Sequence, residues 1–189
     1  MSRFFTSDLH FGHKRVIEFC SRPWPDVFEM NEGLIERWND TVGPDDDVWI
    51  LGDLTFVGTQ ATARYMKCLN GRKHLLRGNH DWKRIGPKRL DLGFETIVDE
   101  TTDIWLDHPD DGWRTHARMS HFPYQFSHPS DSRYEDLRPK DNGSWLLHGH
   151  VHRSWKVKGK MINVGVDVWD YRPVSERTIV DIIRQAEAN

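Results

Sequence analysis

The chain has 189 residues, a length typical of one folded domain, and we expect a single domain over residues 1–189. Its 26 Lys and Arg against 29 Asp and Glu give a formal net charge of −3, which argues against a protein that holds polymeric nucleic acid mainly by charge. Its two cysteines, Cys20 and Cys68, form no CxxC pair, which excludes a disulfide framework and a cysteine zinc site. Asp8 and His10 interrupt any signal peptide and no apolar run could span a membrane, so we expect a cytoplasmic protein without a membrane partner.

The first half of the chain is predicted to alternate strands and helices. Short β-type runs over residues 4–8 and 48–53 each stop at an aspartate. Between them, apolar residues recur at helical spacing behind Asn31, which we expect to cap that helix at its N-terminus. A helix over 59–69 and a strand over 74–77 repeat the pattern. The chain is therefore expected to begin as a β-α-β unit.

The second half is predicted to be mostly β-structure, closed by a helix that begins near Ser175 as its N-cap. The expected strands cover residues 94–98, 102–107, 114–120, 144–147 and 155–166, and the last is folded into a hairpin at 158–160. Helices first, strands later and a final helix indicate an α/β sandwich of two packed sheets flanked by helices.

Five short segments hold most of the side chains that can bind a metal ion. Each lies at or just past a predicted strand end, where open α/β sheets bind their ligands. The segments are residues 8–10, 52–53, 78–81, 120–123 and 148–152. Side chains two positions apart on an extended segment project to the same side, so residues 8 and 10, and residues 150 and 152, are each expected to form half of a metal site.

The number of candidate ligands favours two metal ions rather than one. The seven are Asp8, His10, Asp53, Asn79, His121, His150 and His152. Seven ligands are too many for one ion with an open position and suit two ions that share a bridging carboxylate. Imidazole and carboxylate without thiolate suit Mn, Fe, Zn or Co better than calcium.

The order of the segments carries a family resemblance. The blocks D-x-H, G-D, G-N-H-[DE], a lone H and G-H-x-H follow one another between residues 8 and 152, and in this order they resemble the signature of the calcineurin-like metallophosphoesterases. The chain looks most like the small bacterial and phage-type members, whose sequences are similar to residues 7–13, Arg22-Pro23 and 163–167. The resemblance implies a four-layer αββα sandwich of two mixed β-sheets flanked by helices.

The resemblance also implies a role for each ligand. Asp8, His10 and His152 would bind one ion, Asn79, His121 and His150 the other, and Asp53 would bridge the two. Manganese is the expected metal, with Fe, Zn, Co and Ni as alternatives. His80, which is not among the ligands, would protonate the leaving group, and Asp81 would orient the His80 ring or cap a helix that begins near Trp82.

Four residues are candidates for binding the substrate. Asn79 and His13 lie within or next to the motifs, and Arg22 could donate two hydrogen bonds to a phosphate. His148 directly precedes the G-H-x-H block, where packing in the strand is the first interpretation and substrate contact the second. The remaining histidines, His74, His108, His116 and His128, have no motif around them and are interpreted as structural or surface residues, and the acidic run 45–47 is interpreted as a turn.

The expected activity is hydrolysis of a small phosphodiester, with a nucleotide such as a 2′,3′-cyclic nucleotide as the first candidate substrate. The chain lacks the Asp-Arg pair that follows G-D in phosphoprotein phosphatases, and it is too short and too acidic for the added segments of the family's DNA nucleases. Two alternatives stay open: a phosphomonoesterase with the same metal site, and a non-catalytic scaffold with this fold.

Overall fold

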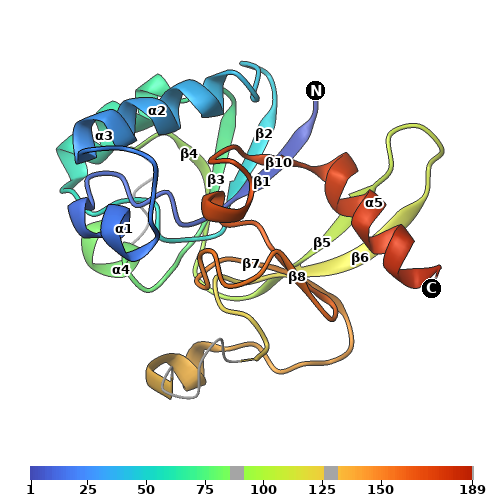
Figure 1. Ribbon diagram of the computed structural model, residues 1–189. Coiled ribbons are helices and arrows are strands. Elements are labelled where there is room, and N and C mark those ends of the chain that lie inside the picture. The colour runs from blue at the N-terminus through green and yellow to red at the C-terminus, as the bar shows by residue number, and fades with distance from the viewer. Residues whose placement is uncertain (86–91, 126–131, 189) are drawn as a thin grey trace.

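The computed structural model describes residues 1–85, 92–125 and 132–188. Ten strands form two five-stranded sheets within these residues (Figure 1). The first sheet has the spatial order β10 (Val174–Ser175), β1 (Arg3–Thr6), β2 (Asp47–Ile50), β3 (Arg72–Leu76) and β4 (Phe94–Val98). Strands β1 to β4 are parallel and β10 is antiparallel to β1, so the sheet is mixed.

The second sheet is mixed as well. Its spatial order is β5 (Thr102–Asp107), β6 (Arg114–Met119), β7 (Trp145–His148), β9 (Met161–Asn163) and β8 (Val157–Lys158). Strands β6, β7 and β9 are parallel, whereas β5 and β8 pair antiparallel with their neighbours. The hairpin predicted around 158–160 is the β8–β9 pair, with shorter strands than expected.

Helices flank the two sheets on both sides, which confirms the predicted α/β architecture (Figure 1). The helices are α1 (Lys14–Phe19), α2 (Val27–Asn39), α3 (Thr59–Cys68), α4 (Asp81–Arg84) and α5 (Glu176–Glu187), with 3₁₀ turns η2 (Ser132–Leu137) and η3 (Val166–Val168). In Figure 1, α1, α2 and α3 cover the first sheet, and α5 lies beside β5 and β10. None of the helices described is long and apolar enough to cross a membrane.

Two apolar cores follow from the alternation of side chains along the central strands. In β2, Val48 and Ile50 belong to the core shared with α2, whereas Trp49 between them packs into the core shared with the second sheet. Phe5 of β1 is fully buried in that second core, where α5 contributes Ile183.

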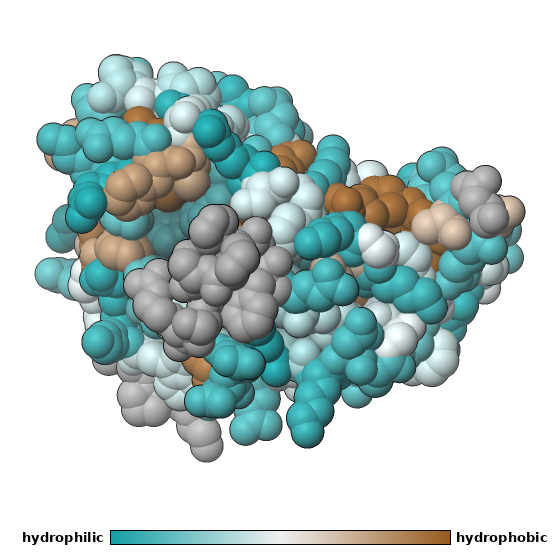
Figure 2. All heavy atoms as spheres, turned by 60° about the horizontal axis from the view of Figure 1, so that its bottom comes forward, coloured by the Kyte–Doolittle hydropathy of each residue, from teal (hydrophilic) through white to brown (hydrophobic). Residues whose placement is uncertain are grey.

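The surface turned to the viewer in Figure 2 is mostly hydrophilic, with hydrophobic atoms in small separate patches.

The cap predicted for α2 is wrong and the cap predicted for α5 is confirmed. Helix α2 begins four residues earlier than Asn31, because Asp26 Oδ1 accepts the N–H groups of Phe28 and Glu29. Asn31 lies inside the helix, and its side-chain oxygen accepts the N–H of Gly12 at 3.0 Å. Ser175 does cap α5, with its hydroxyl accepting the N–H of Thr178.

Candidate metal centre

The seven predicted metal ligands meet at the carboxyl ends of strands from both sheets. Asp8 and His10 follow β1, Asp53 follows β2 and Asn79 follows β3, while His121 follows β6 and the last two histidines, 150 and 152, follow β7. Neighbouring strands are parallel within each of these groups, so their carboxyl ends share one edge. Structure and sequence pattern agree on where the site lies.

Asp53 occupies the centre of the cluster. Its Oδ2 lies 3.6 Å from Nε2 of His10 and 3.5 Å from Nε2 of His121, which belong to opposite halves of the predicted site. On the first side, oxygen and nitrogen atoms of Asp8, His10 and His152 lie within 4.8 Å of one another. On the second side, Asn79 Oδ1 lies 3.1 Å from His121 Nε2, and the rings of His121 and His150 are 5.2 Å apart. This arrangement places one carboxylate between two sets of ligands.

The donor atoms fit divalent cations. Asp8 Oδ1 and His10 Nε2 are buried polar atoms for which the described residues supply no hydrogen-bond partner. Polar atoms in protein interiors are almost always paired, so two convergent exceptions 3.9 Å apart point to a partner from outside the chain. Imidazole nitrogens and carboxylate oxygens are the groups that Mn²⁺, Fe²⁺, Zn²⁺ and Co²⁺ bind.

The other ring nitrogen of three ligand histidines has an acceptor of its own. Nδ1 of His121 lies 2.8 Å from the carbonyl oxygen of Leu51, and Nδ1 of His152 lies 2.8 Å from Oδ2 of Asp167. Nδ1 of His10 lies 3.3 Å from Nδ1 of His13. An Nδ1–H that donates to such an acceptor leaves Nε2 unprotonated, as a metal ligand must be.

The backbone at the ligands is left-handed, which corrects the extended conformation predicted for the two ligand pairs. Five ligand residues have positive φ: Asp8 (57°), His10 (55°), Asp53 (52°), His150 (71°) and His152 (47°). Each such backbone conformation lowers the stability of the fold by about 1–3 kcal/mol. These conformations persist only where the surrounding structure holds them. Here the holding bonds include Asp8 N–H to Gly52 and the N–H of His150 to Oδ2 of Asp8.

Glycine is required at two positions where the segments that hold the metal ligands cross most closely. A Cβ on Gly78 would lie 2.6 Å from the backbone nitrogen of Asp53 and 2.9 Å from Cε1 of His121. A Cβ on Gly52, whose φ is +93°, would lie 2.5 Å from Nδ1 of His121. Neither position can hold a side chain without moving a metal ligand.

Asp81 holds the backbone of the site. Its Oδ2 accepts the N–H groups of Gly78 and Asp53 at 2.8 Å each, and its Oδ1 accepts that of Leu54 at 3.0 Å. The predicted N-cap role is wrong, because His80 occupies the N-cap position of α4. The hydrogen bonds of Asp81 therefore serve the backbone rather than the His80 ring. Burial and the nearby Asp53 charge raise the pKa of Asp81 to about 7.

Charge is concentrated on Asp53 and His121. Burial opposes ionisation of both groups, but the attraction between them prevails. It holds the pKa of Asp53 well below its usual range and raises the pKa of His121 to about 9 in the metal-free chain. The neighbouring histidines therefore favour Asp53 as a carboxylate.

Two of the predicted substrate-binding residues cannot reach a substrate. The Arg22 side chain is fully buried and is ion-paired with Asp167. His148 is also fully buried, with Nδ1 2.8 Å from the carbonyl oxygen of Gly149 and Nε2 accepting the indole N–H of Trp155. Substrate contact is therefore wrong for Arg22 and His148, and the packing interpretation of His148 is confirmed.

The ligand cluster opens into a cavity of about 760 Å³. His13, Asn79 and His80 line it, and the His80 side chain is 38% exposed, with Nε2 3.8 Å from Oδ2 of Asp53. Burial lowers the pKa of the His80 imidazole. The cavity lining also includes an aromatic and cationic set of residues: Arg15, Phe19, Tyr134 and Arg153.

Three residues of this region were not predicted from the sequence. Phe56 stacks on the His13 ring at 3.6 Å, Tyr134 packs edge-on against His150, and Asp167 contacts His152. Asp167 closes the 163–167 segment that resembles the phage-type members, and this was the available signal. Phe56 and Tyr134 lie in segments without a motif.

The histidines without motifs have structural or surface positions, as predicted. His74, His108 and His116 each lie within 3.4 Å of an aspartate oxygen, away from the metal ligands. His128 falls outside the described residues. Of the acidic run, Asp46 binds the backbone N–H groups of Ser2 and Gly43, which agrees with a turn, whereas Asp47 already belongs to β2.

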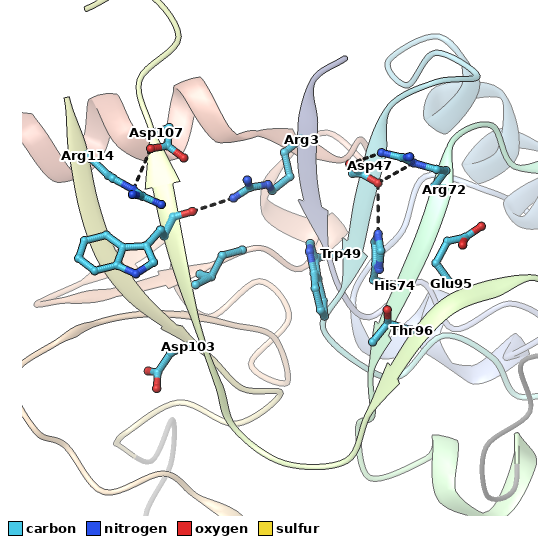
Figure 3. A pocket seen from close by; sticks show the side chains of 12 residues that line it. Arg3, Asp47, Trp49, Arg72, His74, Glu95, Thr96, Asp103, Asp107 and Arg114 are labelled. Atoms are coloured by element: carbon cyan, nitrogen blue, oxygen red, sulfur yellow. Dashed lines mark hydrogen bonds and ion pairs between the residues drawn. The ribbon is translucent and has the colours of Figure 1, made fainter. Parts of the chain in front are cut away.

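A separate cavity of about 680 Å³ lies between the two sheets, toward the amino ends of β1 and β2 (Figure 3). Trp49 and His74 stack on its wall at 4.8 Å. Its charged groups are largely bound to one another: Asp47 binds Arg72 and His74, and Asp107 binds Arg114. None of the seven metal ligands lines this cavity.

Several known proteins are similar to this chain in sequence. Residues 1–154 match the calcineurin-like phosphoesterase family. The gene 66 protein of Mycobacterium phage D29 is 38% identical over 96% of both chains, and that of phage L5 is 36% identical over 95% of this chain and 92% of its own. A Methanocaldococcus jannaschii protein described as uncharacterised is 31% identical over 97% of this chain and 92% of its own.

A solved structure supports the same assignment. The crystal structure of a protein of unknown function from Aquifex aeolicus superimposes with a TM-score of 0.72 and 30% sequence identity, over 96% of this chain and 98% of that one. The family match covers all seven metal ligands and His80. The chain belongs to the calcineurin-like phosphoesterase family.

Proposed function

We propose that the protein is a phosphodiesterase that uses two divalent metal ions and acts on a small diester, with nucleotides such as 2′,3′-cyclic nucleotides as the first substrates to test. One observation carries this proposal: Asp53 Oδ2 lies 3.6 and 3.5 Å from ring nitrogens of two histidines that belong to opposite half-sites. A carboxylate in that position is suited to bridge two cations.

The residues around Asp53 have different roles in the proposed reaction. When bound, two divalent cations would polarise the phosphoryl oxygens and lower the pKa of water, so that phosphorus is attacked at neutral pH. Asn79 lies at the cavity wall, where its side-chain amide can also orient the phosphoryl group. His80 reaches into the cavity beside Asp53, and from there it can give a proton to the leaving alkoxide.

The positions of the arginine side chains favour a diester over a monoester as the substrate. A monoester dianion carries one more negative charge than a diester and gains more from arginines beside the phosphate. Arg22 is buried against Asp167. Of the arginines that line the cavity, Arg15 lies over the Phe19 ring and Arg153 donates to the backbone oxygen of Cys20. A cavity of about 760 Å³ has room for the second ester group.

The metal, partner and location remain predictions. The nitrogen and oxygen ligands suit Mn²⁺ first, with Fe, Zn, Co and Ni as alternatives. The net charge of −3 supports a small ligand rather than a polymeric nucleic acid, and a cytoplasmic location agrees with the two free cysteines.

The test compares turnover of bis-para-nitrophenyl phosphate and para-nitrophenyl phosphate by the Mn²⁺-reconstituted full chain, with and without EDTA. Asp53→Asn removes the bridging charge. Asp103→Asn is the control, because its side chain is 66% exposed and does not line the cavity of the metal ligands. We expect a higher kcat/KM for the diester that is lost in EDTA and in Asp53→Asn and kept in Asp103→Asn.

Other outcomes contradict the proposal in different ways. A higher kcat/KM for the monoester would favour the phosphomonoesterase. Absence of turnover with Mn²⁺ and with each of the alternative metals, Fe, Zn, Co and Ni, would favour the scaffold. Turnover that survives EDTA and Asp53→Asn would overturn metal dependence itself.

A further inference from the structure

Arg22 connects two segments of the metal centre from inside the protein. On one side, its Nη2 donates to the backbone oxygen of Asp8 at 2.7 Å and its Nη1 to that of Leu9 at 2.9 Å. On the other side, its Nε and Nη2 donate to the two carboxylate oxygens of Asp167 at 2.9 and 3.0 Å. The guanidinium thus uses its rigid planar shape to fix two groups relative to each other.

Asp167 passes this constraint on to a metal ligand. Its Oδ2 accepts from Nδ1 of His152 at 2.8 Å, and its side chain is 1% exposed. The two ends of the chain of contacts, Asp8 and His152, are both left-handed residues of the same half-site. The pair therefore supports that half-site at both ends.

The other half-site is supported differently. His121, its corresponding histidine, directs Nδ1 to the backbone oxygen of Leu51, and no charged side chain of the described residues takes that role. Substitution of Asp167 should thus disturb the first half-site directly and leave the contacts of the second in place.

We propose that Arg22 and Asp167 are positioning residues for the half-site of Asp8, His10 and His152, and that the affinity of this half-site for its metal ion depends on them while that of the second half-site does not. This inference rests on the metal-dependent function proposed above. Loss of a partner that orients a ligating histidine typically weakens metal binding by about 10- to 100-fold.

The test measures metal binding directly, with Mn²⁺ as the probe. Isothermal titration and electron paramagnetic resonance are recorded for the wild-type chain and for Asp167→Asn, which keeps the side-chain size. Glu176→Gln is the matched control, because it removes an Arg–carboxylate pair of 3.0 Å, between β1 and α5, that is away from the metal ligands. We expect two tight sites in the wild type and the control, and one unchanged plus one weakened about 10- to 100-fold in Asp167→Asn. The spectrum of a coupled Mn²⁺ pair should give way to that of isolated ions.

A second variant identifies the site that is lost. Asn79→Ala weakens the second half-site, so combining it with Asp167→Asn should remove tight binding altogether. If Asp167→Asn does not fold, Arg22→Lys replaces it, since lysine keeps the charge but not the fork of donors.

The two proposals fail separately. A wild-type chain that binds no Mn²⁺ overturns the metal-dependent function. Two unchanged tight sites in the folded variant overturn the role of Arg22 and Asp167 alone, as would equal weakening of both sites.

Discussion

Asp81 lies beside the metal ligands. We expect replacement of its carboxylate to reduce the stability of the fold rather than to affect proton transfer. In Asp81→Asn, the amide oxygen can take the place of Oδ2 and keep the N–H groups of Gly78 and Asp53. The new NH₂ group then faces the N–H of Leu54, which loses its acceptor. A buried donor left unpaired costs about 1–3 kcal/mol, so the free energy of unfolding should fall by about that amount.

Asp81→Ala leaves all three N–H groups without the carboxylate, and we expect a loss of about 3 kcal/mol or more. The assay is urea unfolding followed by tryptophan fluorescence, in EDTA so that metal binding does not contribute. A pH of 8 lies above the pKa of about 7 and keeps Asp81 ionised in the wild type.

Asp46→Asn is a matched control. Asp46 also accepts two backbone N–H groups, those of Ser2 and Gly43, but it is partly exposed, so water can replace its oxygens and the cost should stay below about 1 kcal/mol. The reasoning is refuted if Asp81→Asn unfolds with wild-type free energy yet loses its turnover. That result would return Asp81 to the proton chemistry predicted from the sequence.

Three further predictions concern His80, Gly78 and His148. His80→Asn should lower kcat by about 10²- to 10⁴-fold with two Mn²⁺ still bound, and His116→Asn should not; a parallel loss of metal would contradict a role in proton transfer. Gly78→Ala should lower both Mn²⁺ affinity and Tm, because its Cβ would meet Asp53 and His121, whereas Gly58→Ala meets nothing within 4 Å; equal effects of the two would contradict the steric argument. Burial lowers the pKa of His148 to about 4, so the unfolded chain takes up more protons between about pH 4 and 6.5. His148 should therefore contribute a loss of about 3 kcal/mol of stability as the pH drops through that window. This contribution is measured as the difference between the urea titrations of the wild type and of His148→Asn, and a difference that does not change with pH would exclude it.

The ligands of the site could be predicted from the sequence because each belongs to a short block and the blocks occur in a fixed order. Asp8, Asp53 and His121 needed no knowledge of packing to be singled out. Strands β4 and β5 were also predicted with their observed bounds, since their apolar and turn residues are local signals. The two mixed sheets followed from the family resemblance, and the structure confirms them.

The roles that were predicted wrongly depend on what surrounds a side chain. Arg22 has the chemistry to bind a phosphate, but its guanidinium is sealed against Asp167, 145 residues farther along the chain. His148 directly precedes the metal motif, yet its side chain in β7 is fully buried in the protein interior. Asn31 and Asp26 are both suitable N-cap residues, and only the packing of α2 decides between them. Long-range burial of this kind leaves no periodic signal in a single sequence.

The distribution of ligands between the sheets has a mechanical consequence. One half-site combines Asp8 and His10, which follow a strand of the first sheet, with His152, which follows a strand of the second. The other combines Asn79 of the first sheet with His121 and its neighbour from the second. Each bound cation would therefore act as a cross-link between layers that are otherwise joined largely by apolar packing, and it would resist sliding of one sheet past the other. In such a protein, rigidity of the reaction centre and cohesion of the two halves of the molecule are maintained by the same few bonds.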